Sequence, residues 1–226
     1  MHHGQGQIAE TFWKTEKAAA RILCAPELIP SPGQYLLASD ASDAPLPIPV
    51  FSAGFSADGF LAAPPLPLAW TPGARLQLRG PLGRGFEIPN SARRVALIAF
   101  DDSPTRLLPL LPLALQQNAA VTLLCDSALP DLPSEVEVQP LAALADIFAW
   151  ADYAAFEAAR ESLSELKSRL GLVKQLKAGD EAQILIRAPM PCGGLAECGV
   201  CALTVQHHWK MICKDGPVFD LRAMWD

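Results

Sequence analysis

The sequence predicts a β plus α/β protein that ends in a cysteine-rich module. Residues 11–100 consist of short apolar runs separated by turn sequences such as "IPSPGQ", "AGFSADG" and "GPLGRG", a pattern typical of an antiparallel barrel or sandwich. From residue 93 the apolar runs become continuous and alternate with helical stretches, which indicates buried parallel strands in an α/β layer. Four of the six cysteines then fall within residues 188–220.

The α/β layer is expected to begin with two buried strands, "RRVALIAF" and "AAVTLLCD", with the helical stretch "TRLLPLLPLALQQN" between them. The Ala/Leu/Glu-rich stretch "PLAALADIFAWADYAAFEAARESLSELKSRLG" has apolar residues at three- and four-residue spacing. That spacing predicts one or two amphipathic helices that stop at Gly171. The run "DEAQILIRAP" is expected to add another strand.

The bulk composition excludes several classes of function. A chain of 226 residues, half of them hydrophobic, can bury a large core and is expected to bury an interface as well. Its net charge of -6, without any Lys/Arg cluster, gives no electrostatic basis for binding nucleic acid. The N-terminus lacks the pattern of a secretory signal, and the apolar runs are too short or too interrupted to cross a bilayer. We therefore expect a cytoplasmic protein without a membrane partner.

The spacing of the four clustered cysteines predicts an iron–sulfur centre. Cys192, Cys198, Cys201 and Cys213 follow the pattern C-x5-C-x2-C-x11-C. Plant-type [2Fe–2S] ferredoxins use C-x4-C-x2-C with a distant fourth cysteine, so this pattern differs by one residue in the first gap. In a reducing compartment, clustered cysteines bind metal or do redox chemistry more often than they form disulfides.

The residues around these cysteines favour the cluster over its alternatives. Gly193, Gly194 and Gly199 supply the backbone freedom that a loop close to a cluster needs. A structural zinc site normally has two paired knuckles, whereas only Cys198 and Cys201 form one here. Zinc, and disulfides or unligated thiols, remain the alternatives.

The other histidines and cysteines of interest have simpler interpretations. His207 and His208 are adjacent and lie between the third and fourth clustered cysteines, where we expect a solvated loop. Cys24 and Cys125 lie inside apolar runs, where a small buried hydrophobic side chain is the expected role.

With these residues in view, the C-terminal end resembles the electron-transfer subunit of heteromeric dihydroorotate dehydrogenase. The strings "CGGLAECGVC", "MICKDGPVFD" and "LRAMWD" follow the family's order, and "CKDGPVFD" is the most specific of the matches. Upstream, "SPGQYLL" is similar to the family's "PGQF" strand, and "WTPGARLQLRGPLGRGFEIP" is similar to its "GPLGNGF" element. The resemblance thus extends over most of the chain and is strongest at its end.

This resemblance implies three parts. They would be a flavin-reductase-like antiparallel β-barrel at 1–92, a degenerate Rossmann-like α/β region at 93–180 and a [2Fe–2S] module at 181–226. In the family, electrons from dihydroorotate reach FMN in a separate catalytic subunit, cross the cluster to FAD and reduce NAD. The resemblance therefore implies pyrimidine biosynthesis and a flavin-containing dehydrogenase partner, and it assigns Cys192, Cys198, Cys201 and Cys213 as the cluster ligands.

The barrel departs from the family at its flavin motif. The family has an "RPxS"-type motif whose Arg faces the flavin pyrophosphate, whereas this chain has "PIPVFSAG" with Pro49 at the position of the Arg. Phe51 and Ser52 remain as flavin-binding candidates. A later element with an Arg and a Gly-Thr pair is replaced by "GFLAAPP". FAD binding therefore stays open.

The "GPLGRGF" loop supplies the other cofactor-binding candidates. The resemblance implies that Gly80, Gly83, Arg84 and Gly85 face a flavin, with Arg84 as the residue able to meet a phosphate. The alternative is a tight loop between barrel strands, for which this glycine content is equally suited.

The α/β region departs further from the family. Where the family has a Gly-rich turn after its first strand, this chain has "IAFDDSPTRLLPLL". Asp101 and Asp102 place two negative charges where a pyrophosphate requires bare N–H groups. The family's later "CGP" element is replaced by "WADYAAF". We therefore expect that the NAD site is lost.

These observations predict a redox subunit that relays electrons one at a time and docks on a flavin dehydrogenase as a hetero-oligomer, without being a complete enzyme alone. The alternative is a non-catalytic scaffold or redox-sensing subunit whose cluster is structural. A third interpretation, a conventional FAD/NAD reductase, requires NADH-dependent reduction of a dye by the purified protein. The sequence leaves the partner's identity and the terminal electron acceptor open.

Overall fold

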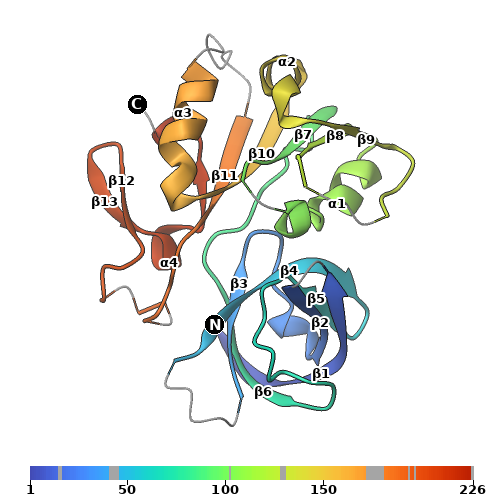
Figure 1. Cartoon of the computed structure of the whole chain (residues 1–226), viewed down its shortest axis with the longest axis vertical. Helices are drawn as coiled ribbons and strands as arrows, with labels where there is room; N and C mark the ends of the chain where they lie inside the picture. The colour runs from blue at the N-terminus through green and yellow to red at the C-terminus, as the bar shows by residue number, and fades with distance from the viewer. Residues whose placement is uncertain are drawn as a thin grey trace.

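The computed structural model describes residues 1–14, 17–40, 46–101, 103–127, 131–171, 181–192, 194–195 and 197–224. Gly193 and Asp102, which entered the predictions above, lie outside these residues. A closed barrel and a six-stranded sheet form the two halves of the molecule, and a two-stranded hairpin lies beside the sheet (Figure 1). The predicted fold, an antiparallel barrel followed by an α/β unit and a C-terminal cysteine module, is confirmed.

The first half is a closed antiparallel barrel with the strand order β1-β2-β5-β4-β3-β6. Its strands are β1 (His2–Lys14), β2 (Lys17–Cys24), β3 (Tyr35–Ser39), β4 (Ile48–Ser56), β5 (Gly59–Ala62) and β6 (Arg75–Leu82). A short 3-10 helix, η1 (Pro26–Leu28), follows β2. The barrel encloses an apolar core that includes Ile8, Leu36 and Phe60. Because the barrel is closed, it has no sheet edge. Of the two predicted alternatives for this half of the chain, the structure is therefore the barrel and not the sandwich.

Strand β1 begins earlier than the sequence pattern predicted. Strands were expected from residue 11, whereas β1 starts at His2 and pairs with β6 through residues 2–7 and with β2 from residue 6 onward. Gly4 and Gly6 conceal the strand because they interrupt the apolar alternation. A Cβ on Gly4 would lie 2.7 Å from a methyl of Leu28, so these glycines serve close packing.

The second half is a sheet in the order β14-β11-β10-β7-β8-β9, in which β14 is antiparallel and the other strands are parallel. The strands are β7 (Arg94–Ala99), β8 (Ala120–Leu124), β9 (Val136–Gln139), β10 (Tyr153–Ala159), β11 (Glu181–Arg187) and β14 (Val218–Asp220). The chain moves outward from β7 to β9 and returns on the other side of β7. A crevice at the carboxyl ends of β7 and β10 follows from this switch in direction.

The connections of this sheet are short helices. They are η2 (Pro104–Arg106), α1 (Leu110–Gln116), η3 (Leu141–Ala143), α2 (Leu144–Trp150), η4 (Arg160–Ser162) and α3 (Leu163–Gly171). The helix predicted between the first two strands is confirmed as α1, and the described part of α3 extends to Gly171. Within the described residues, no helix is long and apolar enough to cross a membrane.

The helices predicted in the Ala-rich stretch are confirmed as α2 and α3, but the strand between them was not predicted. Residues 153–159 form strand β10, which lies between β7 and β11 and is buried along nearly its whole length. Alanine favours helix locally, but a strand hydrogen-bonded on both sides and covered on both faces satisfies its backbone there. Tertiary context therefore overrides local propensity at this position.

The C-terminal segment contributes both to the sheet and to a separate hairpin. After β11 the chain passes through the cysteine loop to β12 (Ala202–Val205), β13 (His208–Met211), α4 (Ile212–Asp215), β14 and η5 (Arg222–Met224). Because β11 and β14 belong to the six-stranded sheet, the segment 181–226 is anchored on both sides of the loop. One apolar cluster joins this segment, the sheet and the barrel residues Tyr35 and Phe51.

Candidate functional site: the cysteine loop and the interdomain cleft

The four clustered cysteines differ in exposure. Cys201 and Cys213 are buried, Cys192 is half-buried and Cys198 is exposed, and none of the four forms a disulfide. Strand pairing of β12 with β13 brings Cys201 close to Cys213, because Ile212 N–H donates to the Cys201 carbonyl at 3.1 Å. The loop thus has a buried side and an exposed side.

Tyr35 from barrel strand β3 lies beneath the buried side of the loop. The side chain is fully buried, and its hydroxyl donates to the carbonyl oxygen of Cys213 at 2.7 Å. Burial raises the pKa of this phenol, and the nearby Cys213, Cys201 and Cys192 raise it further, while Arg79 lowers it. The hydroxyl therefore stays protonated and acts as a hydrogen-bond donor.

The glycines of the loop adopt the backbone that the sequence predicted. Gly194 and Gly199 have φ values of 78° and 69°, in the left-handed region that favours glycine. A Cβ on Gly194 would lie 3.1 Å from the Tyr35 hydroxyl, whereas Gly199 has open space around it. His207 and His208 are both exposed; His207 lies in the turn of the β12–β13 hairpin, as predicted, whereas His208 begins β13.

The "GPLGRGF" loop of the barrel packs against the cysteine segment. The Arg84 N–H donates to the Gly216 carbonyl at 2.6 Å, and a Cβ on Gly83 would lie 2.6 Å from that same oxygen. Arg84 also forms an isolated bridge with Pro217. The backbone of this loop therefore packs against the "KDGPVF" string and positions it.

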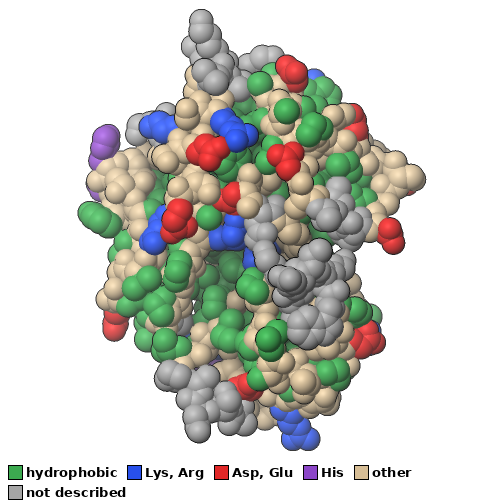
Figure 2. Space-filling model, viewed as in Figure 1, with side chains coloured by type: hydrophobic (Ala, Val, Ile, Leu, Met, Phe, Trp, Pro, Cys, Tyr) green, Lys and Arg blue, Asp and Glu red, His purple; other side chains and the backbone are tan. Residues whose placement is uncertain are grey.

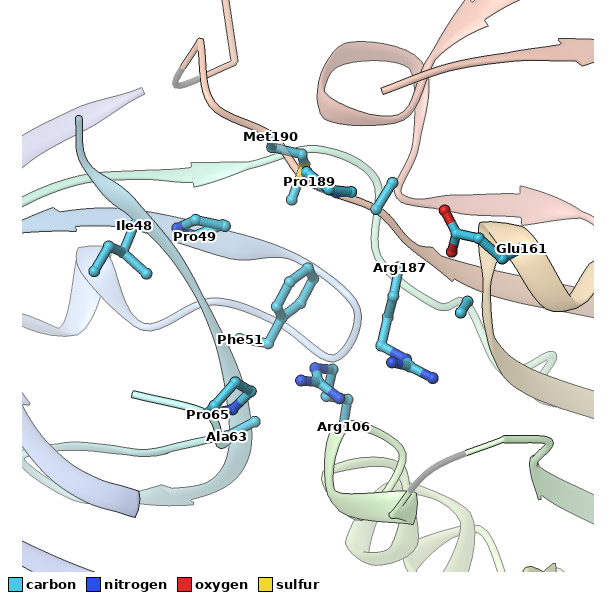
Figure 3. Close-up of a pocket in the computed structure, with 12 residues that line it drawn as sticks. Ile48, Pro49, Phe51, Ala63, Pro65, Arg106, Glu161, Arg187, Pro189 and Met190 are labelled. Atoms are coloured by element: carbon cyan, nitrogen blue, oxygen red, sulfur yellow. The ribbon is translucent and has the colours of Figure 1, made fainter. Parts of the chain in front are cut away.

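A cleft separates the barrel from the α/β unit and leads toward the cysteine loop. It has a volume of about 370 Å³. Barrel residues Ile48, Pro49 and Phe51 form one wall (Figure 3). Pro189 and Met190, which precede the cysteine loop in the chain, form another part of the lining. Arg106 and Arg187 reach into the cleft from the α/β side.

The floor of this cleft is an ion-pair network at the carboxyl ends of the parallel strands. Arg106 pairs with Glu157 at 2.7 Å, and Arg187 pairs with the same carboxylate at 3.1 Å and with Asp101. Arg106 also donates to the Pro64 carbonyl at 2.7 Å, which ties the α/β unit to the barrel. Figure 2 shows basic and acidic side chains meeting near the middle of this face, with hydrophobic side chains below them.

The two carboxylates of the network balance its two arginines; the Arg106–Glu157 pair is buried, and Arg187 and Asp101 are partly exposed. The side chains of Arg106 and Glu157 are 9% and 1% exposed. Asp101 also accepts a hydrogen bond from the Ala159 N–H at 2.7 Å, which holds it against the end of β10. A buried charge that loses its partner is strongly destabilising. The ion pairs therefore hold the two arginines to carboxylates within the protein.

Comparison with known families decides the nature of the cysteine segment. Residues 189–224 match the family model described as the iron-sulfur cluster binding domain of dihydroorotate dehydrogenase B. This segment, the cluster-binding domain, is similar to the iron–sulfur cluster binding domains of that family. The resemblance predicted from "CKDGPVFD" and the cysteine spacing is thereby confirmed. Together with the fold, the match supports an electron-transfer subunit of the dihydroorotate dehydrogenase B type.

Solved structures extend the likeness to the whole fold. A structure of NADH-dependent reduced ferredoxin–NADP oxidoreductase, described for flavin-based electron bifurcation, is 18% identical and has a TM-score of 0.71. The alignment covers 96% of this chain and 88% of that one. The ferredoxin reductase of carbazole 1,9a-dioxygenase is 14% identical, with a TM-score of 0.66 and coverage of 82% and 68%. Ferredoxin-NADP+ reductase from Plasmodium falciparum is 9% identical, with a TM-score of 0.61 and coverage of 81% and 95%.

The residues of the cluster-binding domain fit an iron–sulfur group by their chemistry. Four thiols on one short segment are the soft ligands that such clusters use, and three of them lie close enough to Tyr35 to influence its pKa. Among the described residues, no three His, Cys, Asp or Glu side chains are gathered tightly enough to hold a single metal ion. The donor set, the left-handed glycines and the exposed edge at Cys198 suit a cluster at the surface of the loop.

The lining of the cleft combines an aromatic wall with cations that are paired within the protein. A volume near 370 Å³ lies at the lower end of the range for small-molecule sites, and Phe51 offers an aromatic wall for a flat ring. A pyrophosphate also requires cations or bare N–H groups. Within the described lining, both arginines are already paired with carboxylates, and Glu161 adds a further negative charge.

The six residues predicted to contact a cofactor separate into two groups. Phe51 lines the cleft, whereas the described lining does not include Ser52, Gly80, Gly83, Arg84 or Gly85. Ser52 is buried, and its hydroxyl donates to the Gly54 carbonyl at 3.0 Å within strand β4. Gly83 and Arg84 lie instead against Gly216 and Pro217 of the cluster-binding domain, whereas Gly80 and Gly85 lie against barrel residues, which favours a structural role for this loop.

No local sequence pattern marks the residues that connect the barrel, the sheet and the cysteine loop. The network draws on three separate segments of the chain, which contain Arg106, Glu157 and Arg187. Glu157 also lies in the Ala-rich stretch, for which helices were predicted. Tyr35 was noted only as part of a strand. Of the two remaining cysteines, Cys125 is buried as predicted, whereas Cys24 is half-buried and desolvation raises its pKa to about 11.

Proposed function

We propose that this chain is the electron-transfer subunit of a two-component flavin dehydrogenase, with a [2Fe–2S] cluster held by Cys192, Cys198, Cys201 and Cys213. The observation that carries the proposal is the family match over residues 189–224, which contain all four cysteines in the family's order. Such a cluster takes up or releases one electron at a time, so two successive transfers move the electron pair of a reduced flavin.

The cluster-binding domain also offers a surface for a partner. Leu195, Val200 and Trp209 are 61%, 43% and 75% exposed around the cysteine loop. An exposed tryptophan is the residue type most often found at the energetic centre of an interface. We infer that a flavin-containing catalytic subunit of the dihydroorotate dehydrogenase type docks here, in the cytoplasm, where thiols stay reduced.

The ion-pair network supports loss of the nicotinamide site. Asp101, Glu157, Arg106 and Arg187 fill the crevice where α/β proteins of this topology bind the phosphates of a dinucleotide. The electrons would then leave to an acceptor other than NAD. For FAD, the cleft offers a ring-binding wall at Phe51, and its lining arginines are engaged by carboxylates.

The test is anaerobic purification after co-expression with a dihydroorotate dehydrogenase catalytic subunit, followed by assay of iron, sulfide, zinc and flavin. We expect two irons and two sulfides per chain, a reducible EPR signal with S = 1/2, and no change in protein fluorescence on titration with NADH. Zinc without sulfide would contradict the redox proposal, and saturable binding of NADH would restore the reductase interpretation.

Partner docking has its own test. Trp209→Ser should slow reduction of the cluster by the partner's reduced flavin by about tenfold or more, because truncating a central anchor costs roughly 2 kcal/mol of binding. Leu68→Ser is the matched control, since Leu68 is 69% exposed and lies in the barrel unit. Equal rates for the two variants in stopped-flow absorbance would place the docking surface elsewhere.

A second function, that of a scaffold or redox sensor, is favoured by the filled crevice alone. In that case the cluster would not exchange electrons with the partner's flavin. Rapid mixing of the oxidised protein with the dihydroorotate-reduced partner separates the two functions, because a relay is reduced within the turnover time and a scaffold is not.

A further inference from the structure

Tyr35 is the side chain through which the barrel touches the backbone of the proposed cluster ligands. Its hydroxyl donates to the Cys213 carbonyl at 2.7 Å from a fully buried position. Gly194, on the other arm of the loop, approaches so closely that an added Cβ would lie 3.1 Å from this hydroxyl. Both arms of the cysteine loop therefore pack around one phenolic O–H group.

The ring of Tyr35 faces the other functional region. Its centroid lies 5.7 Å from that of Phe51, with the planes tilted by 40°. Phe51 lines the interdomain cleft, and the Arg106 guanidinium lies 5.7 Å from the Phe51 centroid. Tyr35 is thus in contact with the cysteine loop through its oxygen and with the wall of the cleft through its ring.

The hydrogen bond has an electrostatic consequence for a cluster on this loop. A donor on the Cys213 carbonyl withdraws electron density from that peptide and directs the positive end of the O–H dipole toward it. In a buried site this effect is only weakly screened, so it stabilises added negative charge nearby. Reduction of a cluster adds one negative charge, and hydrogen bonds around the ligands are among the factors that set cluster potentials.

We propose that Tyr35 is a positioning residue for the cluster, whose hydroxyl holds the Cys213 peptide and makes the cluster easier to reduce without being needed for its assembly. The inference rests on the proposed function, because it requires Cys213 to be a cluster ligand. It adds a role for a barrel residue in setting the redox behaviour of the C-terminal domain.

The test is the Tyr35→Phe variant, which removes the hydroxyl and keeps the ring against Phe51. Wild type and variant are purified anaerobically, assayed for iron and sulfide, and titrated with dithionite while the EPR signal of the reduced cluster is followed. We expect full iron and a more negative midpoint potential. The ratio of reduced to oxidised cluster at a fixed potential should fall about threefold to tenfold, which corresponds to roughly 30 to 60 mV.

Tyr153→Phe is the matched control. Tyr153 is also fully buried, and its hydroxyl donates to Gln183 Oε1 at the same distance of 2.7 Å. It lies at the start of β10, where it pairs with Val95 and Glu181. This variant should lose similar stability and leave the potential unchanged, so a general loosening of the fold cannot produce the predicted difference.

The outcomes separate the two levels of the argument. A cluster with the same midpoint potential in wild type and Tyr35→Phe would overturn the role of Tyr35 and leave the proposed function intact. Loss of the cluster in Tyr35→Phe, with retention in Tyr153→Phe, would also overturn the inference, because the hydroxyl would then be required for assembly. Wild-type protein without iron and sulfide would overturn both.

Discussion

The cluster-binding domain and the crevice of the α/β sheet belong to one continuous fold, yet they differ in what they retain. The domain keeps four cysteines in a loop with left-handed glycines and matches a family model over residues 189–224. The crevice lies at the carboxyl ends of the parallel strands and holds the ion-pair network of Asp101, Glu157, Arg106 and Arg187. A shared fold therefore does not by itself imply a shared ligand site.

The largest expected effect tests whether the cluster-binding domain holds a cluster through its cysteines. Cys201→Ser replaces a buried thiol with an oxygen that is a poor ligand for iron. We expect nearly complete loss of iron, sulfide and visible absorbance. Cys125→Ser, which changes another buried cysteine at the end of β8, should keep the cluster. An unchanged iron content in Cys201→Ser would show that Cys201 is not a cluster ligand, and would contradict the view that the C-terminal segment retains its binding site.

The filled crevice predicts the next largest effect. Arg106→Met leaves the Glu157 carboxylate buried with one cation fewer, and we expect a loss of about 3 kcal/mol in the free energy of unfolding. Arg169→Met is the control, because the Arg169–Glu165 pair is exposed and contributes less than about 0.5 kcal/mol. Chemical denaturation measures both. Similar losses in the two variants would mean that the network does not hold the crevice closed.

The contact between the cluster-binding domain and the barrel predicts a smaller effect on stability. Gly83→Ala introduces a Cβ 2.6 Å from the Gly216 carbonyl at a φ of 73°. Gly73→Ala carries a similar backbone strain at a φ of 90° with nothing within 4 Å. We expect Gly83→Ala to cost about 2 kcal/mol more than Gly73→Ala, and to speed limited proteolysis of the C-terminal segment. Equal costs would argue that the two parts can separate freely.

The smallest effect concerns acid stability at the other end of the same sheet. Hydrogen bonds from Arg94 lower the pKa of Asp152 below its ordinary value. Because the folded pKa is depressed, this stabilisation is complete above the unfolded pKa of about 3.9 and is lost as the pH falls through the folded pKa. Asp152→Asn should remove that part of the pH dependence, worth less than about 1 kcal/mol. Denaturant midpoints at pH 6 and pH 3.5 provide the measurement.

Element type was predictable where local pattern and tertiary environment agree. The barrel strands, the first two sheet strands and α1 carry their own periodicity and turn residues. Strand β10 does not, because its alanines are compatible with helix until β7 and β11 pair with it on both sides. The first residues of β1 were not predicted as strand for a related reason, since Gly4 and Gly6 replace the apolar side chains that mark a strand.

The sequence by itself determined the chemistry of this protein's C-terminal end. Four soft ligands, their spacing and the "CKDGPVFD" string lie within one short segment, so no long-range folding is needed to recognise them. The family match over residues 189–224 supports an iron–sulfur cluster in this segment, and the assignment of the four cysteines as its ligands stays a prediction.

Only the tertiary structure decided how that segment is connected to the rest of the protein. Tyr35 meets the carbonyl of Cys213 across 178 positions of sequence, and Arg106 meets Glu157 across 51. Neither contact has a local pattern, because each depends on which strand ends the sheet and the barrel bring together. Ligand identity is a property of residue types, whereas the environment of the ligands is a property of the packed fold.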